Sequence, residues 1–153
     1  MVDVLIAIDH IKKYTKDIHS ADAFESAPTE KFDAVMRKLE ILGEALKYVI
    51  NDDQISGFCN PKWRRIVDFR NVLAHGYFGI DIIEVFDVVK VHLLIFEQEY
   101  LVFLQQVKVT VELAEALEEA VLKIATKKDP LGASYLTDIK NKVLGFGENQ
   151  QGV

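Results

Sequence analysis

The chain is organised around the stretch Arg70-Asn71-Val72-Leu73-Ala74-His75-Gly76-Tyr77, which places an arginine, an amide, an imidazole and a phenol close together. Apolar periodicity predicts that this stretch ends a helix, with Gly76 at the usual position just past the helix end. Asn71 and His75 are four residues apart, so they project together from that helix. Arg70 instead falls in the middle of an apolar face, which is formed by Trp63, Ile66, Val67, Leu73 and Ala74. A permanently charged guanidinium in that position needs a partner.

A carboxylate on the preceding helix is the best candidate for that partner. Glu44 follows Gly43, whose missing side chain lets a neighbouring helix approach closely. Glu40 lies one turn before Glu44, and paired carboxylates also occur at metal and acid–base sites. No histidine or third carboxylate stands near this pair in the sequence, so we favour an ion pair or a surface role. His10 and His19 have no second ligand at helical spacing, and we therefore predict no metal site.

Amphipathic periodicity predicts an all-α fold, an antiparallel four-helix bundle with one or two additional C-terminal helices. The core helices are expected at about 3–16, 31–50, 61–75 and 81–106, and the later ones at about 108–126 and 134–144. Asp3, Asn60 and Asp81 are the predicted N-caps, with Pro61 at the first position of the third helix. The fourth helix is expected to be unbroken. We assign residues 1–106 to the bundle and residues 107–153 to a helical extension packed on the same domain.

Basic side chains concentrate around the organising stretch, although the chain has a formal charge of -6. Residues 60–77 have a local charge of +3, so the remainder carries about -9; the charged side chains in this segment are Lys62, Arg64, Arg65 and Arg70 against Asp68. Such an arrangement permits a focused phosphate site on a body that otherwise repels nucleic acid. We predict that Lys62, Arg64 and Arg65 bind RNA, and a solvated basic face is the alternative.

The apolar content of the chain predicts an oligomer. Hydrophobic residues make up 50% of the sequence, which is high for a small monomer. Residues 82–103 are apolar on several sides at once, so this helix must be covered. A second copy of the chain would cover it and form a homodimer, whereas a central position within a single bundle is the alternative.

The sequence argues against several classes of protein. Cys59 is the only cysteine, so no disulfide framework is available and a reducing compartment is expected. The N-terminus lacks a basic region, and the most apolar run is interrupted by Asp87, Lys90 and His92. Neither a signal peptide nor a membrane-spanning helix is therefore expected. We expect a cytoplasmic protein without a membrane contact and without a bound cofactor.

The organising stretch also matches a family pattern. The pattern R-x-x-x-x-H-x-Y is written here as R-N-V-L-A-H-G-Y-F-G-I-D, from Arg70 to Asp81, and a G-E-A segment precedes it at residues 43–45. Over roughly residues 3–104 the chain resembles the HepT-like toxins. These are small HEPN ribonucleases that are paired with a minimal nucleotidyltransferase (MNT) antitoxin. The resemblance implies the helical bundle of the HEPN fold.

The leading hypothesis for function is a metal-independent RNA endonuclease that uses the 2′-hydroxyl of RNA as its nucleophile. His75 would exchange a proton with that hydroxyl or with the leaving 5′-oxygen, because an imidazole titrates near neutrality. Arg70 would neutralise the phosphorane, and Asn71 would orient either group. One histidine does not easily serve as both acid and base, so two copies facing each other across a twofold axis would supply both. The products would carry a 2′,3′-cyclic phosphate and a 5′-hydroxyl.

The resemblance further implies a role for Tyr77, because in HepT-like toxins the tyrosine of this pattern is the site to which the MNT antitoxin attaches AMP. The added phosphate would repel the RNA backbone and could occupy Arg70. From its position alone, Tyr77 is equally well explained as a packed aromatic side chain. The competing hypothesis for the whole chain is a non-catalytic helical partner of a nucleotidyltransferase, in which Arg70 pairs with Glu44 and His75 only caps its helix.

Overall fold

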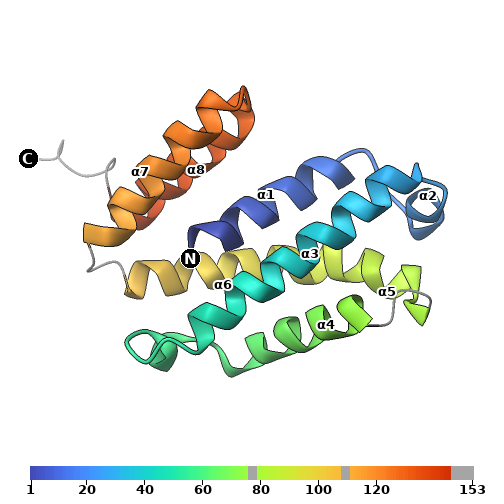
Figure 1. Cartoon of the computed structure of the whole chain (residues 1–153), viewed down its shortest axis with the longest axis horizontal. Coiled ribbons are helices and arrows are strands. Elements are labelled where there is room, and N and C mark those ends of the chain that lie inside the picture. The colour runs from blue at the N-terminus through green and yellow to red at the C-terminus, as the bar shows by residue number, and fades with distance from the viewer. Residues whose placement is uncertain (76–78, 108–110, 146–153) are drawn as a thin grey trace, which may run out of the picture.

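The computed structural model describes residues 1–75, 79–107 and 111–145, and the regular structure within those ranges is entirely helical. This confirms the all-α prediction. The elements are α1 (Val2–Thr15), α2 (Ala21–Glu25), α3 (Thr29–Ile50), η1 (Ser56–Phe58), η2 (Pro61–Trp63), α4 (Arg64–His75), α5 (Ile82–Asp87), η4 (Val88–His92), α6 (Leu93–Gln106), α7 (Val111–Thr126) and α8 (Pro130–Leu144). The first nine form a bundle, and α7 with α8 form a hairpin beside it (Figure 1).

The bundle is built on contacts of α3 with α1 on one side and with α4 on the other. Figure 1 shows the run of α5, η4 and α6 passing behind α3. Trp63 ties the start of α4 to this run, because its indole ring lies within 5.5 Å of three rings of α6, those of Phe96, Tyr100 and Phe103. The Tyr100 hydroxyl donates a hydrogen bond of 3.0 Å to the backbone oxygen of Met1. The start of α4 and the N-terminus are therefore both held against α6.

Side-chain caps explain where several of these helices begin. The Asn60 side chain accepts from the backbone N–H of Lys62, and the Asp81 side chain accepts from that of Ile83, as the sequence predicted. The predicted cap at Asp3 is wrong. The first helix begins at Val2 without a side-chain cap, and Asp3 stands in its first turn, where a negative charge suits the helix dipole.

The last helix begins earlier than the sequence indicated. The sequence placed this helix at about 134–144, whereas α8 starts at Pro130 and continues to Leu144. The Asp129 side chain accepts a hydrogen bond of 3.0 Å from the backbone N–H of Gly132, and proline suits the first helical position. The same two residues therefore end the turn after α7 and begin α8.

The predicted unbroken fourth helix is also wrong in detail, because the five-residue π-helical segment η4 separates α5 from α6. A π-turn holds extra chain per turn, so it rotates the face that α6 presents relative to α5. Val89 and Leu93 remain buried, but several large apolar side chains of η4 and α6 are exposed: Val91, Leu94, Ile95 and Val102. A fully buried central helix does not describe this run.

The α7–α8 hairpin is fastened to α1 and α6 by charged side chains. Lys13 of α1 lies 2.9 Å from Asp129 at the start of α8. Glu97 of α6, only 5% exposed, accepts from the Lys12 ammonium at 2.9 Å and from the Tyr135 hydroxyl at 2.8 Å. Each charge in this contact therefore has a partner from another helix. Across the described ranges, no helix is long and apolar enough to cross a membrane.

Candidate active site

The site begins with the close approach of α3 and α4 at Gly43. A Cβ atom placed on Gly43 would lie 2.4 Å from the Cβ of Arg70 and 3.3 Å from the backbone oxygen of Ile66. Only a glycine leaves room for this crossing. The glycine thus sets how near Arg70 comes to the next residue of α3, Glu44.

Two side chains hold the Arg70 guanidinium. Its Nη2 atom lies 2.9 Å from Oε2 of Glu44, and its Nη1 atom donates a hydrogen bond of 3.0 Å to Oδ1 of Asn71. The Glu44 oxygen accepts no aligned hydrogen bond, so this contact is chiefly electrostatic. A guanidinium carries five N–H donors, and these two contacts occupy at most two of them. With respect to the described residues, Arg70, with 29% of its side chain exposed, therefore keeps donors for an anion.

Arg70 faces a groove of about 370 Å³ between α3 and α4, which we call the α3–α4 groove. It is lined by Asp3, Arg37, Glu40, Ile41, Glu44, Ala45, Tyr48, Arg70 and Ala74. Arg37 is itself paired with Glu40 at 2.8 Å. The groove contains three carboxylates and two guanidinium groups, so a phosphate entering it must compete with Glu44 for Arg70.

The predicted RNA-binding residues do not line this groove. Lys62 and Arg65 border a second groove, the α4–α6 groove of about 380 Å³, whose walls include Trp63 and Phe96. Arg64 is well exposed and lies 3.8 Å from Asp68, one turn along the same helix. The structure thus separates Arg70 and Asn71 from the basic residues at the start of α4.

Two of the predicted site residues lie outside the described part of the structure. Helix α4 ends at His75, as the sequence predicted, but the side chain of His75 is not among those described, and neither is Tyr77. The apolar face predicted around Arg70 is present except at its end. Val67 and Leu73 are buried, whereas Ala74 is exposed and borders the α3–α4 groove.

Sequence reasoning missed Tyr48, which lines the same groove and is 70% exposed. A signal for it was present. Tyr48 and Ile41 are spaced four and three residues from Glu44, so all three share one face of α3. An exposed aromatic ring beside a guanidinium is a surface on which a nucleobase can stack.

The described residues contain one cluster with the donor atoms of a metal site. Asp9, His10 and Asp129 place one ligand atom each within 4.8 Å of one another. The Lys13 ammonium already stands in this cluster, 2.7 Å from Asp9 and 2.9 Å from Asp129. The pKa of His10 lies below its ordinary value because of burial and then because of the nearby Lys38. The cluster reads as an ion-pair network that joins α1 to the hairpin.

Comparison with known proteins identifies relatives for the bundle. A family model described as Ribonuclease HepT-like matches residues 4–107. The "Putative RNase MJ1380" of Methanocaldococcus jannaschii is 39% identical over 90 residues, which are 59% of this chain and 80% of that protein. The "Probable ribonuclease HepT" of Thermococcus cleftensis is 37% identical over 82 residues, or 52% of this chain and 70% of that protein.

A further relative joins two named activities. The "Gamma-glutamylcyclotransferase and putative RNase MJ0434" of M. jannaschii is 36% identical over 89 residues, which are 57% of this chain and 38% of that protein. No solved structure matches the chain. The matched family region ends at residue 107, so the α7–α8 hairpin lies beyond it.

Proposed function

Because this chain belongs to the HepT-like ribonuclease family, we propose that it is a metal-independent RNA endonuclease whose site is built on Arg70, Asn71 and His75. The observation that carries the proposal is the setting of Arg70. Its guanidinium is partly buried in the α3–α4 groove and is oriented by Asn71, and it stands on the helix that ends at His75. A fixed guanidinium with free donors suits a phosphate whose charge increases in the transition state.

The proposed reaction needs a cation, a base and an acid. The base removes the proton of the RNA 2′-hydroxyl, whose oxygen attacks the adjacent phosphorus, while Arg70 binds the non-bridging oxygens of the phosphorane. The acid then protonates the departing 5′-oxygen. The products are a 2′,3′-cyclic phosphate and a 5′-hydroxyl. His75 at the C-terminal end of α4 is placed where the helix dipole favours its protonated form.

We propose that the active form is a homodimer, so that the His75 residues of two copies share the roles of acid and base. Support comes from the exposed apolar side chains along η4 and α6, among them Val91, Leu94 and Val102. Exposed apolar patches of this kind usually mark an interface. The buried side of η4 and α6 would then pack in the core of its own protomer, and the exposed side would pack against the partner.

The proposed regulation follows the family resemblance. An MNT-type antitoxin would transfer AMP from ATP to the hydroxyl of Tyr77, releasing pyrophosphate and silencing the toxin. The AMP phosphate would compete with RNA for Arg70, and the adenosine would block access to it. Intact mass after incubation with the antitoxin, ATP and Mg²⁺ should rise by one or more adenylate groups. A rise that persists in Tyr77→Phe would remove Tyr77 from this proposal.

RNA cleavage in excess EDTA tests the nuclease directly. Arg70→Ala and His75→Ala should abolish cleavage by the dimer, while Lys142→Ala, which removes an exposed positive charge from α8, should retain it. Mass spectrometry of the fragments should find the 2′,3′-cyclic phosphate. Cleavage that requires added Mg²⁺, or that is undiminished in His75→Ala, would contradict the proposal.

One observation favours a second candidate function, a non-catalytic partner of a nucleotidyltransferase. Arg70 is paired with Glu44, as a purely structural arginine would be. The two candidates differ in what Glu44→Gln should do. In the nuclease this change frees Arg70 for phosphate and leaves cleavage active, whereas in a structural pair it only lowers stability.

A further inference from the structure

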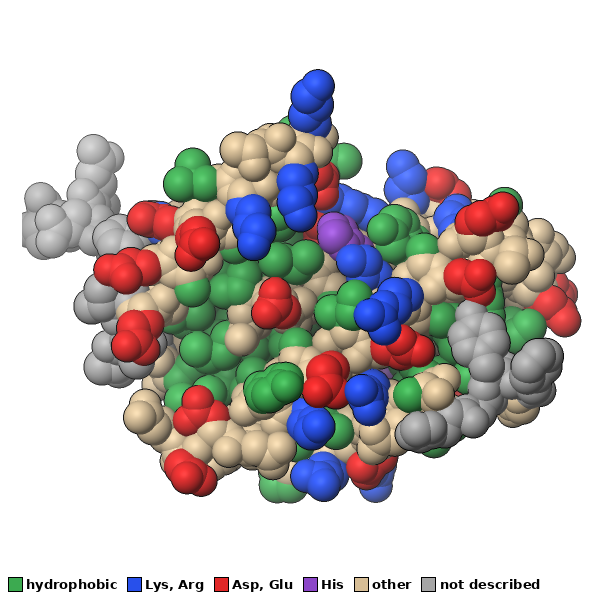
Figure 2. All heavy atoms as spheres, viewed as in Figure 1, with side chains coloured by type: hydrophobic (Ala, Val, Ile, Leu, Met, Phe, Trp, Pro, Cys, Tyr) green, Lys and Arg blue, Asp and Glu red, His purple; other side chains and the backbone are tan. Residues whose placement is uncertain are grey.

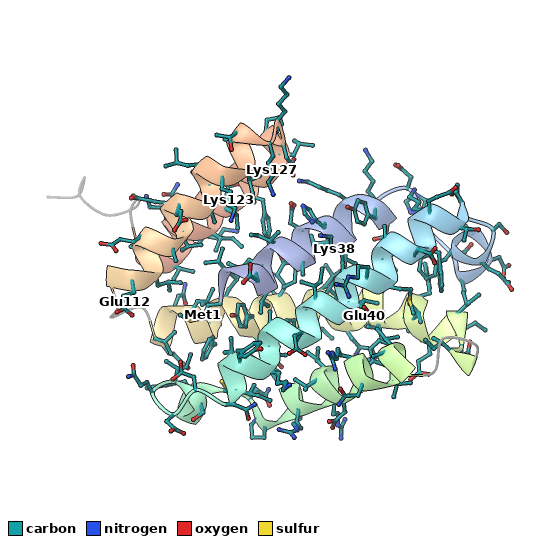
Figure 3. All side chains as sticks on the ribbon, in the orientation of Figure 1. Met1, Lys38, Glu40, Glu112, Lys123 and Lys127 are labelled. Atoms are coloured by element: carbon teal, nitrogen blue, oxygen red, sulfur yellow. The ribbon has the colours of Figure 1, made fainter. Side chains whose placement is uncertain are left out.

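Three lysines from two parts of the chain lie on one face of the molecule. Lys38 stands in the middle of α3, Lys123 is in the last turn of α7, and Lys127 follows that helix. Figure 3 shows Lys123 and Lys127 at the end of α7 and Lys38 on α3, on the same face of the molecule and with α1 between the two helices. Lysine and arginine side chains surround a histidine on this face (Figure 2). We call these three residues the hairpin lysine cluster.

Positive charges in the cluster repel one another, as the effect of Lys127 on Lys38 indicates. Lys38 is partly buried, and its pKa lies below the ordinary value because of burial and then because of the positive charges of Arg37 and Lys127. Bringing ammonium groups together costs free energy that an anion between them would offset. The arrangement is therefore poised for a ligand with negative charge.

Neutralising carboxylates stand elsewhere. Among the described residues, no carboxylate forms an ion pair with Lys38, Lys123 or Lys127 within 4.0 Å, whereas the nearby acidic side chains already have partners. Asp9 and Asp129 are bound by Lys13, and Glu40 is bound by Arg37. The helix dipole explains two lysines at the end of α7, but it does not explain why Lys38 of another helix faces them.

The cluster adjoins the proposed site. Arg37, the residue before Lys38, lines the α3–α4 groove together with Arg70. Lys38 and Glu44 are six residues apart, which is about 9 Å along the axis of α3 and about 120° around it. A single RNA strand with one phosphate at Arg70 would therefore pass Arg37 and cross α3 to reach the cluster.

We infer that the hairpin lysine cluster is a second contact for the RNA backbone, formed only when the end of α7 lies beside α1, on the face of the molecule that also carries Lys38. This inference rests on the proposed ribonuclease function. Lysines bind phosphates as point charges, so the contact adds affinity and register without reading the base sequence. It gives the hairpin, which lies beyond the matched family region, a part in holding the substrate.

Binding of a fluorescent single-stranded RNA whose 2′-hydroxyls are methylated tests the inference separately from cleavage, because this RNA lacks the nucleophile. Fluorescence anisotropy is measured between 50 and about 300 mM NaCl for the wild type and for Lys38→Gln/Lys123→Gln/Lys127→Gln. The matched control Lys16→Gln/Lys31→Gln/Lys142→Gln removes the same total charge elsewhere. Circular dichroism confirms that both variants are folded.

Each contact with a single strand contributes about 0.7 to the slope of log K against log salt, so three lost contacts should reduce the slope by about 2. The cluster variant should also bind about tenfold or more weakly at low salt, and the control variant should follow the wild type. Equal slopes in the two triple variants would overturn the inference. Failure of the nuclease proposal would appear in the cleavage assay and would leave this binding result unchanged.

Discussion

Replacing Gly43 with alanine tests the link between the helix crossing and the site. The new methyl group would lie 2.4 Å from Arg70 Cβ, and ordinary contacts begin at 3.4 Å, so α3 and α4 must separate by about 1 Å at this point. Because Cβ is attached directly to the backbone, a change of rotamer at Arg70 does not relieve the clash. The guanidinium therefore moves with α4, relative to Glu44.

Two opposing effects set the change in the free energy of unfolding. Alanine is favoured over glycine inside a helix by about 1 kcal/mol. Overpacking at a tight contact costs about 1–3 kcal/mol. The net result should be a loss of about 0–2 kcal/mol in stability. A displacement of about 1 Å at a positioning group can lower activity by about 100-fold, so cleavage should suffer far more than folding.

Urea unfolding followed by circular dichroism gives the stability, and RNA cleavage at saturating and low RNA gives the activity. Gly57→Ala is the matched control, because a Cβ atom at Gly57 meets nothing within 4 Å. It should change neither quantity by much. The reasoning would be refuted by a Gly43→Ala protein that is about 1 kcal/mol more stable than the wild type and cleaves RNA equally well.

Three further predictions concern the rest of the fold. Asp129→Asn should remove a part of the stability that depends on pH. The pKa of Asp129 lies below its ordinary value, first because Lys13 donates a hydrogen bond to it. The ionised carboxylate therefore stabilises the fold above about pH 4, and this contribution is lost as pH falls through the lowered pKa. Urea unfolding at pH 7 and below pH 4 should show this in the wild type only. Tyr135→Phe removes the hydroxyl donor that lies 2.8 Å from buried Glu97, and it should lower the free energy of unfolding by about 1–3 kcal/mol in urea at pH 7. An unchanged urea midpoint would contradict this prediction. Leu94→Glu should make the protein monomeric in light scattering with its helical content intact; a persistent dimer would place the interface elsewhere.

Local sequence signals predicted most helices because each signal acts over one or two turns. Asn60 with Pro61 and Asp81 mark helix starts through bonds to backbone N–H groups two residues away. Asp3 has the same composition signal but no such bond, since the chain enters α1 at Met1. The π-turn at residues 88–92 left no trace in the apolar pattern, because that run is apolar on several sides in any helical register.

The site was predictable only where its partners lie close in sequence or where the pattern was specific. The sequence suggested the pair of Glu44 and Arg70 from two signals. Glu44 follows a glycine on α3, and Arg70 is a charged residue within the apolar face of α4. The lysine cluster was not predictable, because Lys127 comes near Lys38 only after the hairpin has packed against α1. His10 looked isolated for the same reason, since Asp129 comes to it from the far end of the chain.

The ion pair between Lys13 of α1 and Asp129 of the hairpin forms late during synthesis of the chain on the ribosome. Lys13 and Asp129 are 116 residues apart, so α1 must wait for nearly the whole chain before its ion pairs are complete. At about 5–20 residues per second, the stretch between the end of α6 and the end of α8 takes about 2–8 s to emerge. During that interval the bundle can assemble through Trp63 and Tyr100, while Glu97 still lacks Tyr135. The nascent bundle is therefore expected to be most open to proteases and chaperones along α1, and pulse proteolysis of ribosome-bound chains stalled before and after α8 would measure the difference.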